Sequence, residues 1–480
     1  MIINAELLLQ YQRCQRRPFL DTHGDYSQRE APHELLVKVQ QDKITHQQSI
    51  IHNLSYIQPD FPSGDWQEGV RATLELMYQG VEYIYKGVLL ATYEEEYTLL
   101  SRPDLLVKQP GKSCFGDWLY IPVDIQLGKR PKQEYQVVAA FHGEILAAVQ
   151  ESPLAEAGLI LRNRDTTYLV DLNKWTPQML DILAEYIEVL ESPEAPEIFI
   201  SRQKCHLCHW YHHCYAIAQS QQHLSLLPGV TPIRYAQLQA ASTTSLETLA
   251  HTHPSILENL TGFDPDIAYK LIVQAQSTLT QTPLTLPYAS SAISLTTTSP
   301  IELYFDIEAQ PDLNLNYLLG VLVVDKQKQT ENFYSLLAEN QTEEALIWQQ
   351  FLDLVNQYPQ APIYHFCNYE VETIKKLGKF YKTPYSYIEP ILSRLVDVYE
   401  QLTQNVALPI ESYALKAIAK WIGFAWRDPE ASGAKCIYWY DQWLETGNHH
   451  FLEQIRIYNE DDCRATLKVK DWLVNFLTSL

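Results

Sequence analysis

The chain has 480 residues, of which 46% are hydrophobic and 20% charged, and its formal net charge is −22. This length is too great for one ordinary core and the composition is that of folded proteins, so we expect two or three domains. The acidic balance argues against a protein that coats nucleic acid through a general positive charge. It fits an enzyme that concentrates carboxylates in its site.

The composition also bears on the compartment. No apolar run reaches the roughly 18 residues that a membrane-spanning helix needs. The first residues, MIINAELLLQYQRCQRRPF, carry their charges after the apolar part, which is the reverse of a secretory signal. Eight cysteines in a chain of this length do not suggest a disulfide framework. We therefore expect a cytoplasmic protein whose closely spaced cysteines serve metal or redox chemistry.

The first region, residues 1–217, mixes amphipathic helical patterns with short strands. It contains RPDLLVK and, further along, WLYIPVDIQLGKRPKQEYQVVAAF. Alternation along a strand places Asp124 and Gln126 on one face of the second segment. The basic runs RCQRRPF and LGKRPK predict either a local strip for phosphate groups or a solvated charged face.

These motifs resemble the PD-(D/E)xK core of RecB-like nucleases, which has an α/β restriction-endonuclease-like fold. The resemblance implies that Asp104 and Asp124 hold a metal ion. It also places His46 where the family often has a histidine, and it matches Gln136 to the glutamine of the helix after the motif strand.

The chain departs from this family at one position. Gln126 stands where the motif has a lysine that helps to position water and to stabilise developing charge. Lys129 or Lys132 could reach in from the next turn. The first region is therefore expected to be either catalytic or a degenerate platform that holds DNA.

The segment KCHLCHWYHHC closes the first region with the spacing C-x2-C-x5-C, one thiol short of a four-coordinate site. A subset of RecB-like nucleases carries an iron–sulfur cluster on one upstream and three downstream cysteines. This resemblance implies a structural [4Fe–4S] cluster on Cys14, Cys205, Cys208 and Cys214. Zinc is the alternative metal. A further alternative is that these cysteines are reduced thiols in a helical turn that bind no metal. Zinc could also recruit the neighbouring histidines, which are His206, His209, His212 and His213.

The middle of the chain divides into a helical stretch and a linker. Residues 218–276 contain two similar turns, LPGV and LTGF, each followed by a helix-like apolar pattern. Such turns resemble helix–hairpin–helix modules, which hold a phosphate on backbone N–H groups, although a helical spacer fits them as well. Residues 277–299 are rich in Thr, Ser and Pro and nearly uncharged, which is typical of a linker.

The last region, residues 300–480, begins with a strand-like segment, LYFDIEA. In a strand, Asp306 and Glu308 point to the same face. Two carboxylates side by side are costly unless a cation lies between them, and a divalent metal is such a cation. This pair therefore predicts a metal site.

Two later segments add to this pair. YHFCNYEVETIKKL presents Glu370 where a strand-like run gives way to a helix, and RIYNEDDCRATLKVKDWL places Tyr458 and Asp462 one helical turn apart. The ordered set resembles the tyrosine-bearing branch of the DEDD exonucleases, on an RNase H-like α/β fold. The resemblance implies that Asp306, Glu308 and Asp462 bind metal and that Tyr458 orients the attacking water. Glu370 would take the place of the usual aspartate.

The whole chain resembles bacterial RecB-like nucleases that carry a C-terminal RNase H-like exonuclease domain. We therefore expect a Mg²⁺- or Mn²⁺-dependent nuclease that trims single-stranded DNA ends in repair or in processing of foreign DNA. DNA is the preferred partner, and an exoribonuclease or a non-catalytic nucleic-acid-binding scaffold is the alternative. Within the C-terminal set, Asp461 could substitute for Asp462 or simply be solvated.

Overall fold

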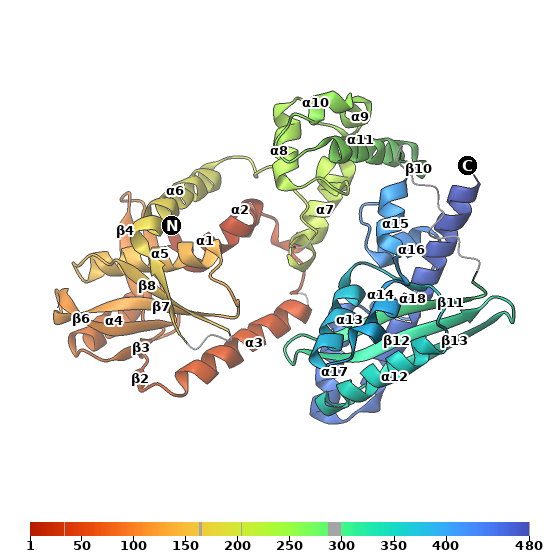
Figure 1. Ribbon diagram of the computed structural model, residues 1–480. Helices are drawn as coiled ribbons and strands as arrows, with labels where there is room; N and C mark the ends of the chain where they lie inside the picture. The colour runs from red at the N-terminus through yellow and green to blue at the C-terminus, as the bar shows by residue number, and fades with distance from the viewer. Residues whose placement is uncertain (33, 163–165, 203, 287–298, 480) are drawn as a thin grey trace. The chain divides into compact units, whose positions relative to one another are not determined.

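The chain is described here by a computed structural model (Figure 1). The described parts are residues 1–32, 34–162, 166–202, 204–286 and 299–479. They form two compact units, Met1–Ala218 and Gln219–Leu480. Both units mix helices with sheets, which confirms the expected α/β class. No helix in these ranges is both long enough and apolar enough to cross a bilayer.

The first unit is built on a six-stranded sheet with the order β2-β3-β6-β7-β8-β9. Three neighbouring pairs, β3–β6, β6–β7 and β8–β9, are antiparallel, and β2–β3 and β7–β8 are parallel. The strands are β2 (Tyr56–Ile57), β3 (Tyr83–Tyr85), β6 (Leu105–Ser113), β7 (Gly116–Gln126), β8 (Glu156–Leu161) and β9 (Tyr168–Asp171).

Helix α5 (Gln133–Val149) is the crossover between the parallel strands β7 and β8, and it forms the core of this unit. Its apolar residues surround the helix instead of lining one face, so almost the whole helix is buried. It contacts β7 and β8 and also a second sheet with the order β1-β5-β4. That sheet consists of β1 (Ile2–Asn4), β4 (Leu89–Tyr93) and β5 (Tyr97–Ser101).

Several other helices of this unit contact α5 or the sheets. Helices α1 and α6 pack on α5, and α3 contacts β7. The bounds are α1 (Ala5–Arg13), α2 (Arg16–His23), α3 (Glu34–Ile51), α4 (Trp66–Tyr78), α6 (Leu172–Glu191), η2 (Cys205–Leu207) and α7 (Tyr211–Ser220).

The second unit begins with a helical part that contains the two glycine turns. Gly229 and Gly262 adopt φ values of +89° and +85°, a conformation that glycine adopts readily. Arg234 bridges the turns, because its Nη1 and Nε donate to the two glycine carbonyls at 2.8 Å each. The helices are α8 (Pro232–Ala240), α9 (Leu246–His251), α10 (Pro254–Leu257) and α11 (Pro265–Thr280).

The structure differs from the expected linker at its start. Helix α11 continues to Thr280, and Ser277 within it is buried. The hydroxyl of Ser277 donates to the carbonyls of Thr282 and Ala407. Strand β10 (Leu284–Thr285) then pairs with β16 (Val406–Ala407). Most of the remaining expected linker, residues 287–298, lies outside the described residues.

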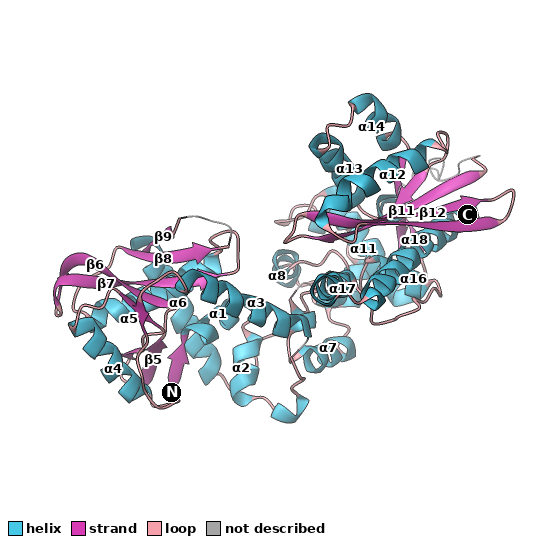
Figure 2. Ribbon diagram, turned by 90° about the horizontal axis from the view of Figure 1, so that it is seen from below, coloured by secondary structure: helices cyan, strands magenta, loops and turns pink. Residues whose placement is uncertain are grey.

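A five-stranded sheet with the order β13-β12-β11-β14-β15 forms the rest of the second unit. The central strand β11 is antiparallel to β12 and parallel to β14. Figure 2 shows α12, α13 and α14 on one face of this sheet and α17 and α18 on the other. The strands are β11 (Ile301–Gln310), β12 (Leu315–Asp325), β13 (Thr330–Leu337), β14 (Ile363–His365) and β15 (Leu395–Asp397).

Helix α18 (His449–Thr478) is the longest helix in the described chain, and it packs along β11 and β12. A buried ion pair fixes it there, since Lys470 Nζ lies 3.0 Å from Glu302 Oε2. The other helices are α12 (Glu344–Asn356), α13 (Tyr369–Phe380), α14 (Tyr385–Leu392), α15 (Val398–Asn405), α16 (Leu415–Trp421) and α17 (Gly433–Thr446).

Candidate active site and cysteine cluster

The central strand β11 and the long helix α18 bring three carboxylates together. Strand alternation puts Asp306 and Glu308 on one face of β11, as expected, and α18 presents Asp462 to the same place. One ligand oxygen from each lies within 4.8 Å of the other two. Among the described residues, no other set of three His, Cys, Asp or Glu side chains has ligand atoms as close together.

These carboxylates are electrostatically unfavourable without a cation. Burial, followed by the neighbouring acids, raises the pKa of both Asp306 and Glu308 well above the ordinary range. Burial likewise raises the pKa of Asp462 to about 7, although hydrogen bonds from Trp426 and Tyr458 oppose the shift. Carboxylate oxygens are the ligands that Mg²⁺ and Mn²⁺ prefer, so the donor set fits a divalent ion.

Glu370 lies close to this group, in the first turn of α13. It is 3% exposed, and its Oε2 accepts no hydrogen bond although it is buried. The nearest cation candidate is His365, whose Nδ1 is 3.5 Å away and already bonded to the carbonyl of Cys367 at 2.6 Å. Glu370 also raises the pKa of Asp306, which places the two acids near each other. The Glu370 carboxylate is therefore a fourth potential metal ligand.

The backbone that leads into Glu370 is strained. Cys367 has a φ of +75°, which is rare for a residue with a side chain. Its N–H donates to Asp397 Oδ1 at 3.0 Å, and this bond helps to hold the turn. Such strain is concentrated at functional sites, where the surrounding structure enforces it.

Helix α18 supplies two further side chains to the group. Tyr458 interacts with Asp462, the residue one turn later, and helps to lower the pKa of that carboxyl. Asn459, which the sequence did not single out, donates from Nδ2 to Asp306 Oδ2 at 2.6 Å. Trp426 Nε1 donates to Asp462 Oδ1 at 2.7 Å. Asp306 and Asp462, two of the candidate metal ligands, are therefore each oriented by a hydrogen bond from a neighbouring side chain.

Two charged groups flank the site. The ammonium of Lys416 lies 5.7 Å from the Tyr458 ring centre and 5.4 Å from that of Trp426. Asp461, the expected alternative to Asp462, accepts hydrogen bonds from the Nε and the backbone N–H of Arg427, at 2.8 and 2.9 Å. Asp461 is therefore engaged outside the three-carboxylate group.

The first unit brings Asp104 and Asp124 together, both buried at the β6–β7 pair. Asp104 Oδ1 accepts from Gln47 at 2.7 Å and forms an ion pair with Lys86, and its Oδ2 accepts from the N–H of Ile125 at 2.7 Å. Lys86 comes from the end of β3, a position that the sequence did not single out.

The other residues expected at this site are placed as follows. His46 lies on α3, and its Nε2 is buried without a hydrogen-bond partner; burial lowers the pKa of its ring. Gln136 is buried on α5 and donates to the carbonyl of Pro131 at 3.0 Å. Lys129 is exposed, and Lys132 lies over the Tyr135 ring at 5.6 Å.

The four expected cluster cysteines lie in the first unit, on elements far apart in the sequence. Cys14 ends α1, Cys205 begins η2, Cys208 follows η2, and Cys214 lies in α7. Burial raises the pKa of Cys205 and Cys214 to about 11 each, and the nearby Cys14 and Cys208 add to both shifts. The fold therefore gathers the thiols, and deprotonating them together would need a compensating metal.

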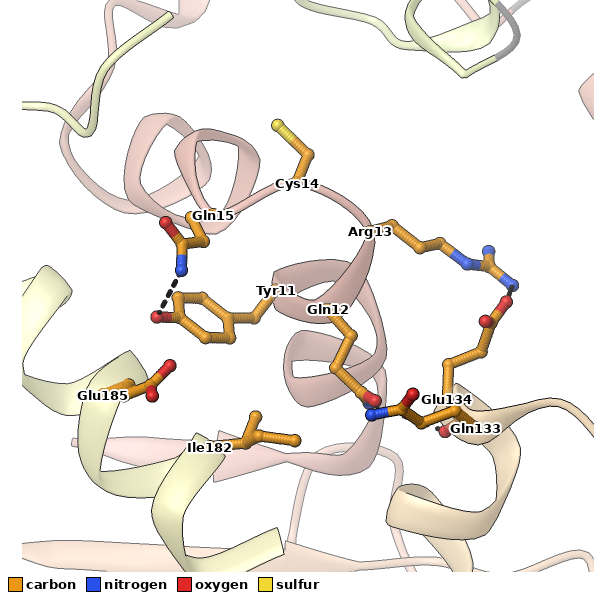
Figure 3. A pocket seen from close by; sticks show the side chains of 9 residues that line it. All are labelled: Tyr11, Gln12, Arg13, Cys14, Gln15, Gln133, Glu134, Ile182 and Glu185. Atoms are coloured by element: carbon orange, nitrogen blue, oxygen red, sulfur yellow. Dashed lines mark hydrogen bonds and ion pairs between the residues drawn. The ribbon is translucent and has the colours of Figure 1, made fainter. Parts of the chain in front are cut away.

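The neighbouring histidines have partners of their own. His206 Nδ1 contacts the carbonyl of Arg202 at 2.9 Å, and His209 Nε2 contacts Asp21 at 2.8 Å. A cavity of about 440 Å³ adjoins the Cys14 turn, and Figure 3 shows the Cys14 thiol pointing away from the side chains on its lower wall. Its lining residues are Tyr11, Gln12, Arg13, Cys14, Gln15, Gln133, Glu134, Ile182 and Glu185.

Comparison with known proteins bears on the second unit. A family model of the RNase H superfamily, RNase_H_2, matches residues 303–474. No curated protein matches the chain. A solved structure titled "Crystal structure of SSO0001" is similar over 45% of this chain and 86% of its own, at 12% identity and a TM-score of 0.23, a score that supports no conclusion. The family match supports a C-terminal RNase H-like domain over the matched residues.

Proposed function

We propose that this protein is a metal-dependent exonuclease that acts on single-stranded DNA ends. The observation that carries the proposal is the convergence of Asp306, Glu308 and Asp462, whose ligand oxygens lie within 4.8 Å of one another. The match of the surrounding domain to the RNase H superfamily supports a nucleic-acid-cleaving hydrolase. The buried carboxylate of Glu370, whose Oε2 lies 3.5 Å from His365 Nδ1, supports a fourth ligand.

Each of these residues would have its own role in hydrolysis. Asp306, Glu308, Glu370 and Asp462 would hold the metal ions, which activate water and stabilise the leaving oxygen when bound. Asn459 and Trp426 orient two of these carboxylates through the hydrogen bonds given above. Tyr458 presents a hydroxyl beside Asp462, where it would orient the attacking water.

The DNA preference and the exonuclease mode are tested together. The assay compares 5′-labelled and 3′-labelled single strands of DNA and RNA, with circular single strands as the control, in Mg²⁺ or Mn²⁺. We expect linear DNA to shorten from one end and the circle to persist. Cleavage of the circle would contradict the exonuclease mode, and faster loss of RNA would favour an exoribonuclease. No cleavage of either polymer would favour a scaffold without catalysis.

We propose further that Cys14, Cys205, Cys208 and Cys214 hold a structural [4Fe–4S] cluster, with zinc as the alternative. A tetrahedral zinc site needs sulfur atoms only about 3.8 Å apart, given Zn–S bonds of about 2.3 Å. The proposal of iron–sulfur over zinc rests on the resemblance of the cysteine spacing to that of the cluster-bearing nucleases. The Ser201 N–H donates to Cys205 Sγ at 3.2 Å, as donors to cluster sulfurs do.

The cluster has a direct optical test. Protein purified without oxygen should be brown, with a broad visible absorption that disappears in Cys208→Ala. Cys114→Ala is the matched control, because Cys114 is an exposed cysteine of the same unit. A colourless wild-type protein with one zinc per chain would contradict the iron–sulfur assignment.

A further inference from the structure

Helix α13 carries exposed aromatic and basic side chains along one face. Tyr369, Lys376 and Phe380 follow the spacing i, i+7 and i+11, so they lie above one another on the helix. Tyr369 is 50% and Phe380 66% exposed, and Lys376 between them is exposed as well. Lys376 Nζ donates to Asn314 Oδ1 at 2.7 Å, and an ammonium has two further N–H groups to offer. We call Tyr369, Lys376 and Phe380 the α13 stripe.

The first residue of the α13 stripe adjoins the candidate metal ligands. Tyr369 directly precedes Glu370, the buried acid in the first turn of the helix. Burial raises the pKa of the Tyr369 phenol, and the charges of Glu370 and Glu308 raise it further. The Tyr369 hydroxyl also donates to Asn316 Oδ1 on β12, at 3.5 Å. A strand whose end lies at the carboxylates would therefore meet the ring of Tyr369 first.

The second half of the helix is basic, although the whole chain has a net charge of −22. Residues 375–382 hold four lysines and no acid. Lys375 pairs with Glu372 of the preceding turn at 2.9 Å, and Lys379 and Lys382 are exposed. Ammonium groups beside exposed aromatic rings, in an otherwise acidic protein, are suited to a polyanion with flat bases.

The α13 stripe is long enough for several nucleotides. The distance along the helix from Tyr369 to Phe380 is about 16 Å, at a rise of about 1.5 Å per residue. Stacked nucleotides rise by about 3.4 Å each, so this length corresponds to about five nucleotides. Two further exposed tyrosines, Tyr385 and Tyr387, follow on α14, which packs on α13 (Figure 2).

We propose that the α13 stripe binds the single strand of the substrate behind the end that is cleaved, an inference that rests on the proposed function. Bases stack on Tyr369 and Phe380, and the ammonium of Lys376 lies beside the phosphates between them. Lys379 and Lys382 add positive charge at the far end of the helix. Because every base has a flat face, this surface tolerates any sequence but requires unpaired bases.

The binding test needs no cleavage, because it uses the full-length chain without divalent metal and a long fluorescent oligothymidylate. Phe380→Leu should weaken binding by about 10-fold, since leucine is apolar but offers no face for stacking, and Phe380→Trp should bind as the wild type. Lys376→Gln should reduce the slope of log affinity against log salt by about 0.7, the effect of one phosphate contact. The matched controls, which should bind as the wild type, are Tyr334→Leu and Lys328→Gln at exposed positions.

Substrate length separates this surface from folding. In the Mg²⁺ assay, Phe380→Leu should raise KM for the long strand by about 10-fold and leave turnover of a trinucleotide unchanged, because about 10 Å of strand does not reach Phe380.

The two proposals fail in different ways. Equal DNA affinity of the wild type, Phe380→Leu and Lys376→Gln would overturn the stacking surface and favour a protein partner for these aromatic residues. Cleavage by that wild type would still support the exonuclease. Weaker binding in both variants of a chain that cleaves nothing would support the stacking surface and overturn the exonuclease proposal.

Discussion

At the scale of single residues, Asn459 shows how tightly the C-terminal site is built. Its amide nitrogen donates to Asp306, while its Oδ1 is buried without a partner and points at β12. Gly320 lies opposite Asp306 on β12, and a Cβ added there would stand 1.6 Å from Asn459 Oδ1. The glycine is therefore needed for space, and the asparagine orients a candidate metal ligand.

The close approach of Asn459 to Gly320 predicts what a side chain added at position 320 would do. Gly320→Ala should displace the Asn459 amide and weaken Mn²⁺ binding by about 10-fold or more, as loss of groups that orient metal ligands does. Asn459→Ala should have a similar effect. Gly433→Ala is the control, because a Cβ there would meet nothing within 4 Å. Equal Mn²⁺ affinity, measured by calorimetry, in the Gly320 and Gly433 variants would contradict this role.

The raised carboxyl pKa values predict how stability depends on pH. Without metal, Asp306, Glu308 and Asp462 retain protons in the folded protein at pH values where the unfolded chain has released them. The contribution of these three groups to the free energy of unfolding should therefore fall as pH rises from about 4 to above 7. Mg²⁺ should reverse the fall, because it stabilises the ionised form.

The measurement is urea unfolding across this pH range with and without Mg²⁺. The variant Asp306→Asn should show a smaller decrease, since one of the titrating groups is gone. Asp353→Asn, which changes an exposed acid on α12, should behave as the wild type. The same pH dependence of stability in metal-free wild type and Asp306→Asn would contradict the raised pKa values.

At the scale of elements, the site depends on how α18 is fixed to β11. Glu302 is fully buried and accepts from Lys470 at 3.0 Å, from Tyr304 at 2.7 Å and from Lys326 at 2.6 Å. This network fixes α18 against the strand that carries Asp306. A change in these interactions would therefore shift helix α18 and, with it, the side chain of Asp462 in the site.

Breaking the network should cost stability. Lys470→Met leaves Glu302 with fewer partners in a buried position, so we expect a loss of about 3 kcal/mol in the free energy of unfolding. Lys328→Met removes a lysine that is 77% exposed and should change stability by less than about 0.5 kcal/mol. Equal urea midpoints for the two variants would show that the buried pair contributes little.

Sequence patterns predicted the parts of the site that follow a local period. Alternation along β11 correctly placed Asp306 and Glu308 on one face, and helical spacing correctly placed Tyr458 and Asp462 together. Asn459 and Lys86 escaped prediction, because their contacts depend on strand register and helix packing between distant segments. The linker was expected to begin at residue 277, whereas helix α11 continues to Thr280. The composition rich in Thr and Ser hid the end of this helix.

At the scale of the whole molecule, the proposed cluster would join distant parts of the first unit. Its four cysteines come from the end of α1 and from the segment around η2 and α7. A metal that binds only the folded arrangement adds its binding free energy to stability. The cluster should therefore stabilise the first unit without stabilising the RNase H-like domain.

Hydrogen–deuterium exchange can locate this stabilisation. In Cys208→Ala, exchange should increase in α1, α2 and residues 204–214, while β11 and β12 keep the protection of the wild type. Cys114→Ala should leave both regions unchanged. Faster exchange throughout the chain would mean that the cysteines stabilise more than the first unit.

We propose that the three-carboxylate site of the second unit cleaves nucleic acid ends. Its most direct test is the degradation of end-labelled single-stranded DNA by the wild type and Asp306→Ala, with Asp353→Ala as the matched control. We predict that Asp306→Ala loses shortening of the strand by at least about 1,000-fold, while Asp353→Ala retains it. Shortening at the wild-type rate by Asp306→Ala would contradict the assignment of the exonuclease to the C-terminal domain.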